Sequence, residues 1–476
     1  MTGKESGMAK KVTLGVIVGN RGFFPAWLAE KGRKEILQTL SKAGVRSVCL
    51  TPKDTKCGTV ETWDDAKKCA ELFRKRAEDI DGILITLPNF GDEKAASNAV
   101  RLSGLDVPVL VHAFPDDPAK LDRLNRRDSF CGKLSVCNNL KQYGIPYSLT
   151  SLHTESPDSD AFARDLDRFV RVCRVVGGVS TARLGAIGAR TGPFNTVRYS
   201  EKILEANGIS TEVLDLSEAL GWVAKLPDKD PSVRAKIRRI RDYVAGEPIP
   251  EGSLLRMAKL GVVIDRWIKA NEIDAMTLQC WTSIVENFGI VPCGIMSMMS
   301  ESLIPAACEV DAMGALGMYA LQLASGTPSS LVDWNNNYGE DPDCCVIFHC
   351  SNLPASAFRR MKTSAQVIIS ETVGAENAYT CTAGVIKEGP ITYARLSTDD
   401  ECGVIRGYVG EGDVLQEEPQ TFGGSGALHV RDLQTLLHFM CRHGFEHHVA
   451  VNYSTTAEAL HEAFTTYLGW DIYHHK

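Results

Sequence analysis

The sequence lacks the patterns that mark several common classes of protein. Its 15 cysteines include no pair separated by two residues, so the spacing of a zinc ribbon is missing. It also has no basic surplus, since 52 Lys and Arg residues stand against 59 Asp and Glu residues and give a net charge of −7. A general nucleic-acid binder needs surplus positive charge to neutralise phosphates. We therefore expect no nucleic-acid partner.

Long hydrophobic runs are absent as well. Charged residues interrupt every apolar run before it reaches the ~20 residues needed to cross a bilayer. Residues 1–11 lead into the apolar segment VTLGVIVGN without the long apolar region of a secretory signal. We therefore expect a cytoplasmic protein with no membrane partner. Its cysteines are expected to be reduced, mostly buried and packed as small hydrophobic side chains.

A nucleotide-binding fingerprint is missing too. The first expected strand is followed by GNRGFFP, which has neither the GxGxxG spacing nor a Walker lysine. A nucleotide-linked oxidoreductase is therefore disfavoured. Asn89 follows the third expected strand, at the edge where open α/β sheets bind their ligands. A ligand contact and a turn-forming role fit Asn89 equally well.

What is present is an alternation of strand and helix patterns in a chain long enough for about three domains. Residues 1–175 and 176–355 alternate apolar, strand-length runs with helical patterns, which is typical of parallel sheets covered by helices on both faces. Residues 356–476 carry short strands separated by closely spaced Gly, Pro and Asp turns. We predict an α/β fold with two doubly wound, Rossmann-like α/β domains, 1–175 and 176–355. A β-rich, barrel-like C-terminal domain follows over 356–476.

Four residues in the second half of the chain are candidate metal ligands. Glu309 begins an apolar helix, while Asp333 and His349 each end an apolar strand. Ordinary structural roles fit these three as well, namely a carboxylate at a helix N-terminus, an Asx turn and a core histidine. His448 follows His447, and because neighbouring residues of a strand face opposite ways, only one of the pair is expected to reach a shared site. Two carboxylates and two imidazoles suit Mn²⁺ or a similar octahedral cation.

Several longer segments carry a resemblance to a known family. They are NFGDE (89–93), HAFPDD and CGKLSVCNNLKQYGIPYSLT (within 112–150), GARTGPFNTVRYSE (188–201), CEVDAMGAL (308–316), SLVDW (330–334) and the histidine pair 447–448. Over nearly its whole length the sequence resembles the L-fucose isomerase and L-arabinose isomerase superfamily, including the C-terminal domain of L-fucose isomerases. The members of that superfamily are metal-dependent aldose–ketose isomerases.

The resemblance implies a metal site and a reaction. A Glu-x-Asp segment and a second acid at a strand end match Glu309 and Asp333. The two metal-binding histidines of arabinose isomerases match His349 and His448, while fucose isomerases use two acids and one late histidine. The resemblance implies that these four residues hold Mn²⁺, or another divalent cation such as Co²⁺ or Mg²⁺. Glu309 and Asp333 are then the acid/base pair that isomerises an aldose through a cis-enediol.

The sugar stays open, because Asp333 is typical of fucose isomerases while the histidine pair and the chain length are typical of arabinose isomerases. L-Fucose, D-arabinose, L-arabinose and a modified, for example anionic, hexose all remain candidates. We expect Arg190, Phe194, Asn89 and Trp334 to bind the substrate. Arg190 offers a fork of donors to hydroxyls or to an acidic group, and an ion pair at the surface or between subunits is the equally weighted alternative.

The resemblance also implies a homo-oligomer, a trimer or a hexamer, with active sites between subunits. The alternative function is a non-catalytic cytoplasmic sugar-binding protein, because tandem α/β domains also build sugar-binding proteins. The β-rich third domain argues against that alternative.

Overall fold

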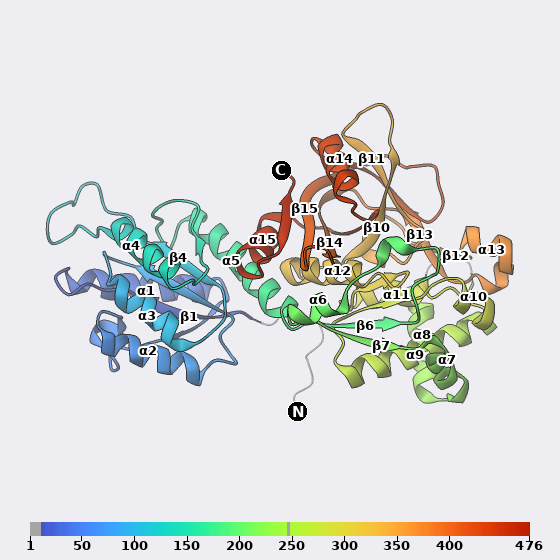
Figure 1. The fold of residues 1–476 in the computed structure, drawn as a ribbon, viewed down its shortest axis with the longest axis horizontal. Coiled ribbons are helices and arrows are strands. Elements are labelled where there is room, and N and C mark those ends of the chain that lie inside the picture. The colour runs from blue at the N-terminus through green and yellow to red at the C-terminus, as the bar shows by residue number, and fades with distance from the viewer. Residues whose placement is uncertain (1–10, 245–247) are drawn as a thin grey trace. The chain divides into compact units, whose positions relative to one another are not determined.

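The computed structural model describes residues 11–244 and 248–476 (Figure 1). The described chain forms two compact units. The N-terminal unit comprises residues 11–177 with 462–469, and the C-terminal unit comprises residues 178–461 with 470–476. Within the described ranges, no helix is both long enough and apolar enough to span a membrane. The expectation of no secretory signal rests mainly on residues 1–10, which lie outside the described residues.

A parallel sheet forms the centre of the N-terminal unit, with the strand order β2-β1-β3-β4-β5. Its strands are β1 (Thr13–Val18), β2 (Arg46–Cys49), β3 (Gly82–Leu87), β4 (Val109–Ala113) and β5 (Ser148–Leu149), and its main helices are α1 (Ala26–Lys42), α2 (Trp63–Lys75), α3 (Glu93–Ser103), α4 (Ser129–Gln142) and α5 (Asp160–Val179). Ile83 and Ile85 of β3 pack into one core with Phe73 of α2. Leu84 of the same strand packs into a second core with Ile36 of α1. Both faces of this sheet are therefore covered by helices, as its continuous apolar strands predict.

A second parallel sheet lies in the C-terminal unit, with the order β7-β6-β8-β9. Its strands are β6 (Arg183–Ile187), β7 (Ser210–Leu214), β8 (Ala275–Leu278) and β9 (Ala306–Cys308), and the helices around it are α6 (Glu201–Ala206), α7 (Leu216–Lys225), α8 (Pro231–Tyr243), α9 (Glu251–Asn271), α10 (Ser283–Phe288), α11 (Cys293–Glu301) and α12 (Ala312–Ser325). Met276 and Leu278 of β8 share a core with Trp267 of α9. The carboxyl ends of β8 and β9 lie side by side, because Leu278 pairs with Cys308.

A nine-stranded mixed sheet completes the C-terminal unit, in the order β12-β13-β16-β11-β10-β17-β14-β15-β18. Its strands are β10 (Ser330–Asn337), β11 (Cys344–His349), β12 (Lys362–Ser364), β13 (Cys381–Val385), β14 (Gly389–Asp399), β15 (Val404–Val414), β16 (Gly424–His429), β17 (His448–Asn452) and β18 (Asp471–His474), accompanied by α13 (Val367–Val373), α14 (Leu433–His443) and α15 (Ala457–Glu462). β15 also pairs with β16. This extra pairing closes six strands, β16-β11-β10-β17-β14-β15, into a ring around a core that includes Tyr393 and Tyr408.

The mixed sheet starts earlier in the chain than the sequence pattern indicates. β10 and β11 precede residue 356, yet β10 pairs with β17 and β11 pairs with β16. The predicted boundary at residue 355 therefore divides this sheet. Short apolar runs predict a strand but not its partner, so these two strands could not be distinguished from α/β strands by sequence alone. The predicted α/β class agrees with the two parallel sheets and the mixed sheet, whereas the Rossmann-like arrangement of domains stays a prediction.

Candidate metal centre

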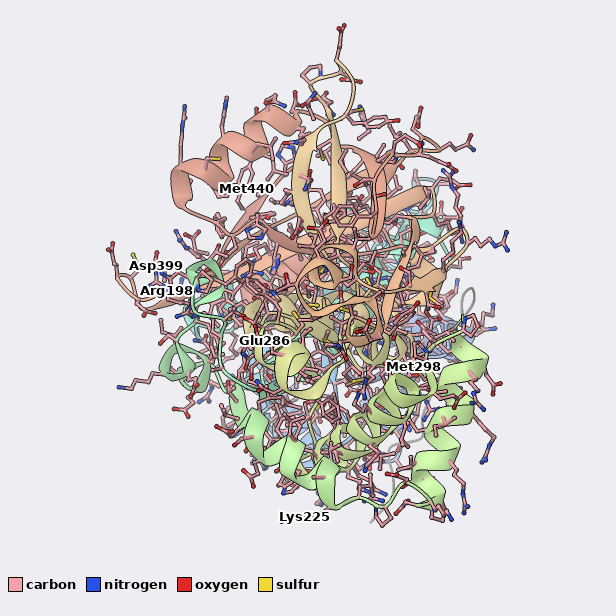
Figure 2. All side chains as sticks on the ribbon, turned by 90° about the vertical axis from the view of Figure 1, so that its right-hand side faces the viewer. Arg198, Lys225, Glu286, Met298, Asp399 and Met440 are labelled. Atoms are coloured by element: carbon pink, nitrogen blue, oxygen red, sulfur yellow. The ribbon has the colours of Figure 1, made fainter. Side chains whose placement is uncertain are left out.

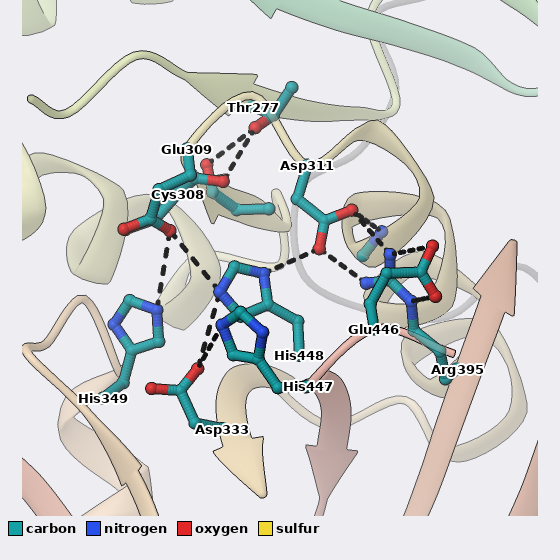
Figure 3. A network of polar contacts seen from close by, with 12 residues as sticks. Thr277, Cys308, Glu309, Asp311, Asp333, His349, Arg395, Glu446, His447 and His448 are labelled. Atoms are coloured by element: carbon teal, nitrogen blue, oxygen red, sulfur yellow. Dashed lines mark hydrogen bonds and ion pairs between the residues drawn. The ribbon is translucent and has the colours of Figure 1, made fainter. Parts of the chain in front are cut away.

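The four expected metal ligands lie close together in the C-terminal unit (Figure 3). Glu309 lies in the loop between β9 and α12, beyond the carboxyl end of the parallel sheet. Asp333 lies within β10, His349 is the last residue of β11, and His448 is the first residue of β17. The strands β11, β10 and β17 are consecutive neighbours in the mixed sheet. The site thus forms where one end of the parallel sheet faces three adjacent strands of the ring.

The donor atoms of these residues are close together but not hydrogen bonded. Nε2 of His448 lies 3.7 Å from Oε2 of Glu309 and 3.5 Å from Oδ1 of Asp333. Nε2 of His349 lies 3.8 Å from the same oxygen of Glu309. Both carboxylate oxygens, Glu309 Oε2 and Asp333 Oδ1, are buried and accept no hydrogen bond from any described residue.

Unpaired buried carboxylate oxygens are costly, and such atoms in native structures call for a partner. Two oxygen and two imidazole donors within a few ångströms form a ligand set that suits a divalent cation such as Mn²⁺. Glu309, His349 and His448 form one such cluster, with donor atoms mutually within 4.8 Å, and Asp333 joins His448 and His447 in another. The residues present therefore fit the cation that the resemblance implies.

The backbone holds Glu309 in an unusual conformation. Glu309 and Val310 have φ values of 59° and 61°, in the left-handed region that a β-branched residue rarely adopts. The hydroxyl of Thr277 donates a hydrogen bond to the carbonyl of Cys308 (3.3 Å) and fixes the start of this turn. The indole N–H of Trp281 donates to Oε1 of Glu309 (3.1 Å). Strained backbone of this kind is retained where the surroundings dictate it, and it is frequent at active sites.

Asp311 orients one of the histidines. Its Oδ2 lies 2.9 Å from Nδ1 of His448 (Figure 3). Because an ionised carboxylate only accepts hydrogen bonds, Nδ1 must carry the proton, which leaves the lone pair of Nε2 free to bind a cation. Burial raises the pKa of Asp311, but Arg395 and His448 lower it more, so its carboxyl stays ionised well below its usual range.

Arg395 holds Asp311 in turn. The guanidinium, which is fully buried, donates to Asp311 at 2.5 Å and 3.2 Å and to Glu446 at 3.1 Å. Asp311 also accepts the backbone N–H of Gly314 (2.8 Å) and caps α12. Bidentate pairing and complete hydrogen bonding make this buried charge network rigid. His448 is therefore supported by groups that cannot easily move.

The carboxylates around the site favour the protonated, positively charged form of its two buried histidines. Burial lowers the pKa of His349, but Cys350 and the two carboxylates raise it more, to about 9. The pKa of His448 is raised as well, since Asp311 and the carboxylates outweigh its burial. Without a metal the imidazoles attract protons, and the same negative surroundings attract a cation, which replaces those protons.

The expectation that only one residue of the histidine pair reaches the site is wrong. The rings of His447 and His448 lie 4.7 Å apart, and Nε2 of His447 is 3.8 Å from Oδ1 of Asp333. β17 begins at His448, so His447 precedes the strand and the alternation of a pleated strand does not apply to it. His447 is 44% exposed at its side chain, whereas His448 is buried. Burial and the neighbouring His448 lower the pKa of His447, which favours the neutral imidazole.

The four residues expected to bind substrate lie in different places. The ring of Phe194 lies 5.5 Å from the rings of both His447 and His448, so it borders the metal site. Trp334 lies on the other side of β10, where its indole N–H donates to the hydroxyl of Tyr408 (2.9 Å) in the core of the ring. Trp334 is therefore not brought to the metal site, because side chains alternate along a strand and Asp333 takes the other face.

Asn89 belongs to the N-terminal unit, where its amide donates to Asn20 (2.8 Å).

Arg190 lines a cavity of about 910 Å³ in the C-terminal unit. The loop that follows β6 forms one wall of this cavity and also carries Phe194. Arg198, from the same loop, and Asp399 of β14 also line this cavity, and both are labelled in Figure 2. Neither Arg190 nor Arg198 forms an ion pair with any described residue.

Sequence reasoning missed three residues that shape the site. Asp311 could have been found, because it stands two positions after Glu309 and begins a helix pattern, which is typical of an N-cap. Trp281 and Arg395 gave no signal, since their contacts with Glu309 and Asp311 join segments far apart in the sequence.

Known proteins match this chain over most of its length. The domain family described as fucose/sulfoquinovose isomerase, N-terminal domain, matches residues 15–180, and the family described as L-fucose isomerase, C-terminal domain, matches residues 347–475. A sulfoquinovose isomerase of Priestia aryabhattai is 26% identical over 358 residues, which cover 75% of this chain and 77% of the relative. A sulfoquinovose isomerase of Alkalicoccus urumqiensis is 24% identical over 389 residues, 80% of this chain and 83% of the relative.

One solved structure aligns with this chain at a low score. An ABC transporter solute-binding protein from Burkholderia multivorans aligns with 67% of this chain and 95% of its own, at 11% identity and a TM-score of 0.15. At that score the alignment says nothing about the fold.

The matches, together with the α/β architecture, define this protein as an aldose–ketose isomerase, and the non-catalytic alternative is not favoured. The matched domains and relatives are consistent with the L-fucose isomerase superfamily. The resemblance drawn from the sequence motifs is thereby confirmed.

Proposed function

We propose that this enzyme is a metal-dependent isomerase that interconverts an anionic, sulfonated aldose and the corresponding ketose. One observation carries the metal dependence, namely two buried carboxylate oxygens without partners beside two imidazole Nε2 atoms. Glu309, Asp333, His349 and His448 would hold the cation, with Mn²⁺ as the first choice and Co²⁺ or Mg²⁺ as alternatives. When bound, a divalent cation supplies polarisation of the substrate carbonyl and stabilisation of the negative charge that develops on its oxygens.

The protein groups move the protons. Isomerisation removes the proton from C2, delivers a proton to C1 and transfers the O2 proton to O1, so the net composition of the sugar is unchanged. Glu309 and Asp333 are the acid/base pair for these transfers. Their environments differ, since Glu309 is buried and accepts from Trp281, whereas the side chain of Asp333 is 21% exposed beside His447.

The remaining groups orient and enclose the sugar. Phe194 covers the two histidines with an apolar ring, which limits the access of water to the enediol. Asp311 keeps His448 in the tautomer that presents Nε2 to the cation. The substrate contact expected of Asn89 stays a prediction, since its amide is buried and already hydrogen bonded to Asn20.

The anionic substrate class has two supports. The curated relatives named above are sulfoquinovose isomerases, which act on a sulfonated sugar. In this chain, Arg190 and Arg198 stand on the loop that carries Phe194 and have no carboxylate partner among the described residues. A guanidinium offers paired donors to a sulfonate as it does to a carboxylate or phosphate. We therefore assign the sulfonate contact to this loop.

A substrate panel tests the proposal. The enzyme is stripped with EDTA, reloaded with Mn²⁺ and assayed for ketose formation from sulfoquinovose, L-fucose, L-arabinose and D-arabinose. We expect activity only after reloading, and the highest kcat/KM with sulfoquinovose. Replacing Arg190 by Ala is expected to raise KM for the sulfonated sugar more than for a neutral one. Metal-independent turnover contradicts the proposed centre, and a preference for a neutral sugar contradicts the substrate class.

A further inference from the structure

Five cysteines that are far apart in the sequence lie close together next to the metal centre. They are Cys280, Cys293, Cys308, Cys350 and Cys381. The thiol of Cys308 is in hydrogen-bonding contact with the thiols of Cys280 and Cys293. Cys293 is also in contact with Cys350 and Cys381. All five are free, and Cys308 and Cys350 are the direct chain neighbours of Glu309 and His349. These thiols therefore contact one another, unlike cysteines that are dispersed through a hydrophobic core.

The fold explains the meeting of the first three. Cys308 ends β9, and Cys280 follows the neighbouring parallel strand β8, so both lie at the carboxyl edge where α/β sheets bind ligands. Cys293 is the first residue of α11. Glu309 follows Cys308 and turns its carboxylate into the same region.

The donor distances fit a metal ion. The thiols of Cys280 and Cys308 and one carboxylate oxygen of Glu309 all lie within 4.8 Å of one another, and all three residues are buried. A tetrahedral zinc ion with Zn–S bonds of ~2.3 Å holds its sulfur ligands about 3.8 Å apart, which lies within this limit. Thiolate ligands select soft cations over Mn²⁺ and Mg²⁺.

We propose that Cys280 and Cys308, together with Glu309, form a second cation site that takes a thiophilic divalent ion of the zinc and cadmium class, with Cys293 as a neighbouring thiol. Each thiol that binds the ion releases its proton. Because Glu309 is shared with the proposed isomerase centre, a cation on the thiols draws away one of that centre's carboxylates. Thiophilic cations therefore displace Mn²⁺ and inhibit the enzyme from a site that is distinct from the sugar-binding face.

Cadmium titration of the full-length, reduced, metal-free protein tests the site. Cd²⁺ bound to thiolates gives a charge-transfer absorption in the ultraviolet, which reports on binding independently of activity. The exposed Cys131, Cys402 and Cys441 are first replaced by Ser to remove competing surface thiols. We expect one Cd²⁺ per chain with this absorption, and a Cys308→Ala variant that loses the absorption and binds at least about tenfold more weakly.

Two further variants keep the result unambiguous. Cys173→Ala, in the core of the N-terminal unit, is the matched control and should titrate as the parent does. Cys280→Ala repeats the test should Cys308→Ala fail to fold, as judged by circular dichroism. An unchanged absorption in the folded Cys308 or Cys280 variant, or no absorption in the parent, means that these thiols only pack as small hydrophobic groups and overturns the proposal.

Mn²⁺ electron paramagnetic resonance separates this proposal from the proposed function. We expect Cd²⁺ to release bound Mn²⁺ from the parent but not from Cys308→Ala. If the protein binds no Mn²⁺, the proposed isomerase centre is wrong. The cadmium absorption should still appear in that case, because it reports binding to the thiols alone. Simultaneous binding of both ions, with no release, contradicts the sharing of Glu309.

Discussion

Asp333 and His448 are paired directly across the antiparallel strands β10 and β17, and Oδ1 of Asp333 lies 3.5 Å from Nε2 of His448. Directly opposed residues of such a pair have side chains on the same face of the sheet. The register of two strands therefore places a carboxylate and an imidazole side by side. Glu309, from the loop that follows β9 in the same unit, approaches His448 of this pair.

The carboxylates are expected to be essential. Glu309→Gln and Asp333→Asn keep the volume of the side chain but remove its charge and basicity. We expect the rate of ketose formation to fall by at least about 10³, because both acid/base catalysis and electrostatic stabilisation are lost. Glu286→Gln, an exposed residue of α10, is the control and should keep the parental rate (Figure 2). A Glu309→Gln enzyme with a tenth of the parental activity would show that the site is misassigned.

The two histidines should differ in their effect on metal affinity. Nε2 of His448 approaches both carboxylates, whereas Nε2 of His447 approaches only Asp333. We expect His448→Asn to weaken Mn²⁺ binding by at least about 10–100-fold, the range measured for groups that only support a ligand. His447→Asn should change Mn²⁺ affinity much less. Titration of each metal-free variant with Mn²⁺, followed by electron paramagnetic resonance, makes the comparison, and the reverse order would reassign the ligand to His447.

Asp311 is expected to act through His448. Asp311→Asn keeps a side chain that can cap α12, since Asn and Asp cap helices about equally well. It removes the charge that fixes the His448 tautomer, so we expect Mn²⁺ affinity to fall by about 10–100-fold. Asp92→Asn is the matched control, because Asp92 caps α3 in the N-terminal unit by the same kind of hydrogen bond. If Asp311→Asn and Asp92→Asn bind Mn²⁺ with the same affinity, Asp311 only stabilises the structure and does not support the metal ligand.

The same carboxylate predicts a pH dependence of stability. Arg395 and His448 hold the pKa of Asp311 below its usual range despite burial, so the unfolded chain binds a proton at a higher pH than the folded one. The stability that Asp311 contributes is therefore present above its unfolded pKa of about 3.9 and declines as the pH falls from about 5. At pH 7, loss of a charge that faces a buried guanidinium should cost about 3 kcal/mol of unfolding free energy. Urea unfolding should show the gap between parent and Asp311→Asn narrowing toward pH 4, and a gap that is constant with pH would contradict this account.

Assembly is a prediction that rests on the resemblance alone. The resemblance implies that the first domain of one subunit covers the active site of its neighbour. The pair Arg126-Arg127 lies in a loop of the N-terminal unit and suits such a role, whereas the segment NFGDE includes the buried Asn89 and ends at Glu93, the first residue of α3. We expect a homo-oligomer, a hexamer, whose dissociation abolishes activity. Light scattering combined with assays across a dilution series checks this, and a fully active monomer would exclude it.

The sequence by itself determined the class of fold and the identity of the four proposed ligands. Continuous apolar strands such as GILITL, separated by helical patterns, predict parallel α/β sheets because both faces of such strands are buried. The motifs CEVDAMGAL and SLVDW and the histidine pair single out Glu309, Asp333 and His448, because those residue types in that order are typical of the superfamily.

Only the tertiary structure decided what surrounds those ligands. The pairing of β10 with β17, the left-handed turn at Glu309 and the hydrogen bond from Trp281 depend on segments that meet in space but are remote in sequence. Local patterns record which face of a strand is apolar, but they do not record its partner strand or its register. For the same reason, no spacing in the chain predicts that Arg395 holds Asp311 or that Cys280 and Cys308 meet beside Glu309.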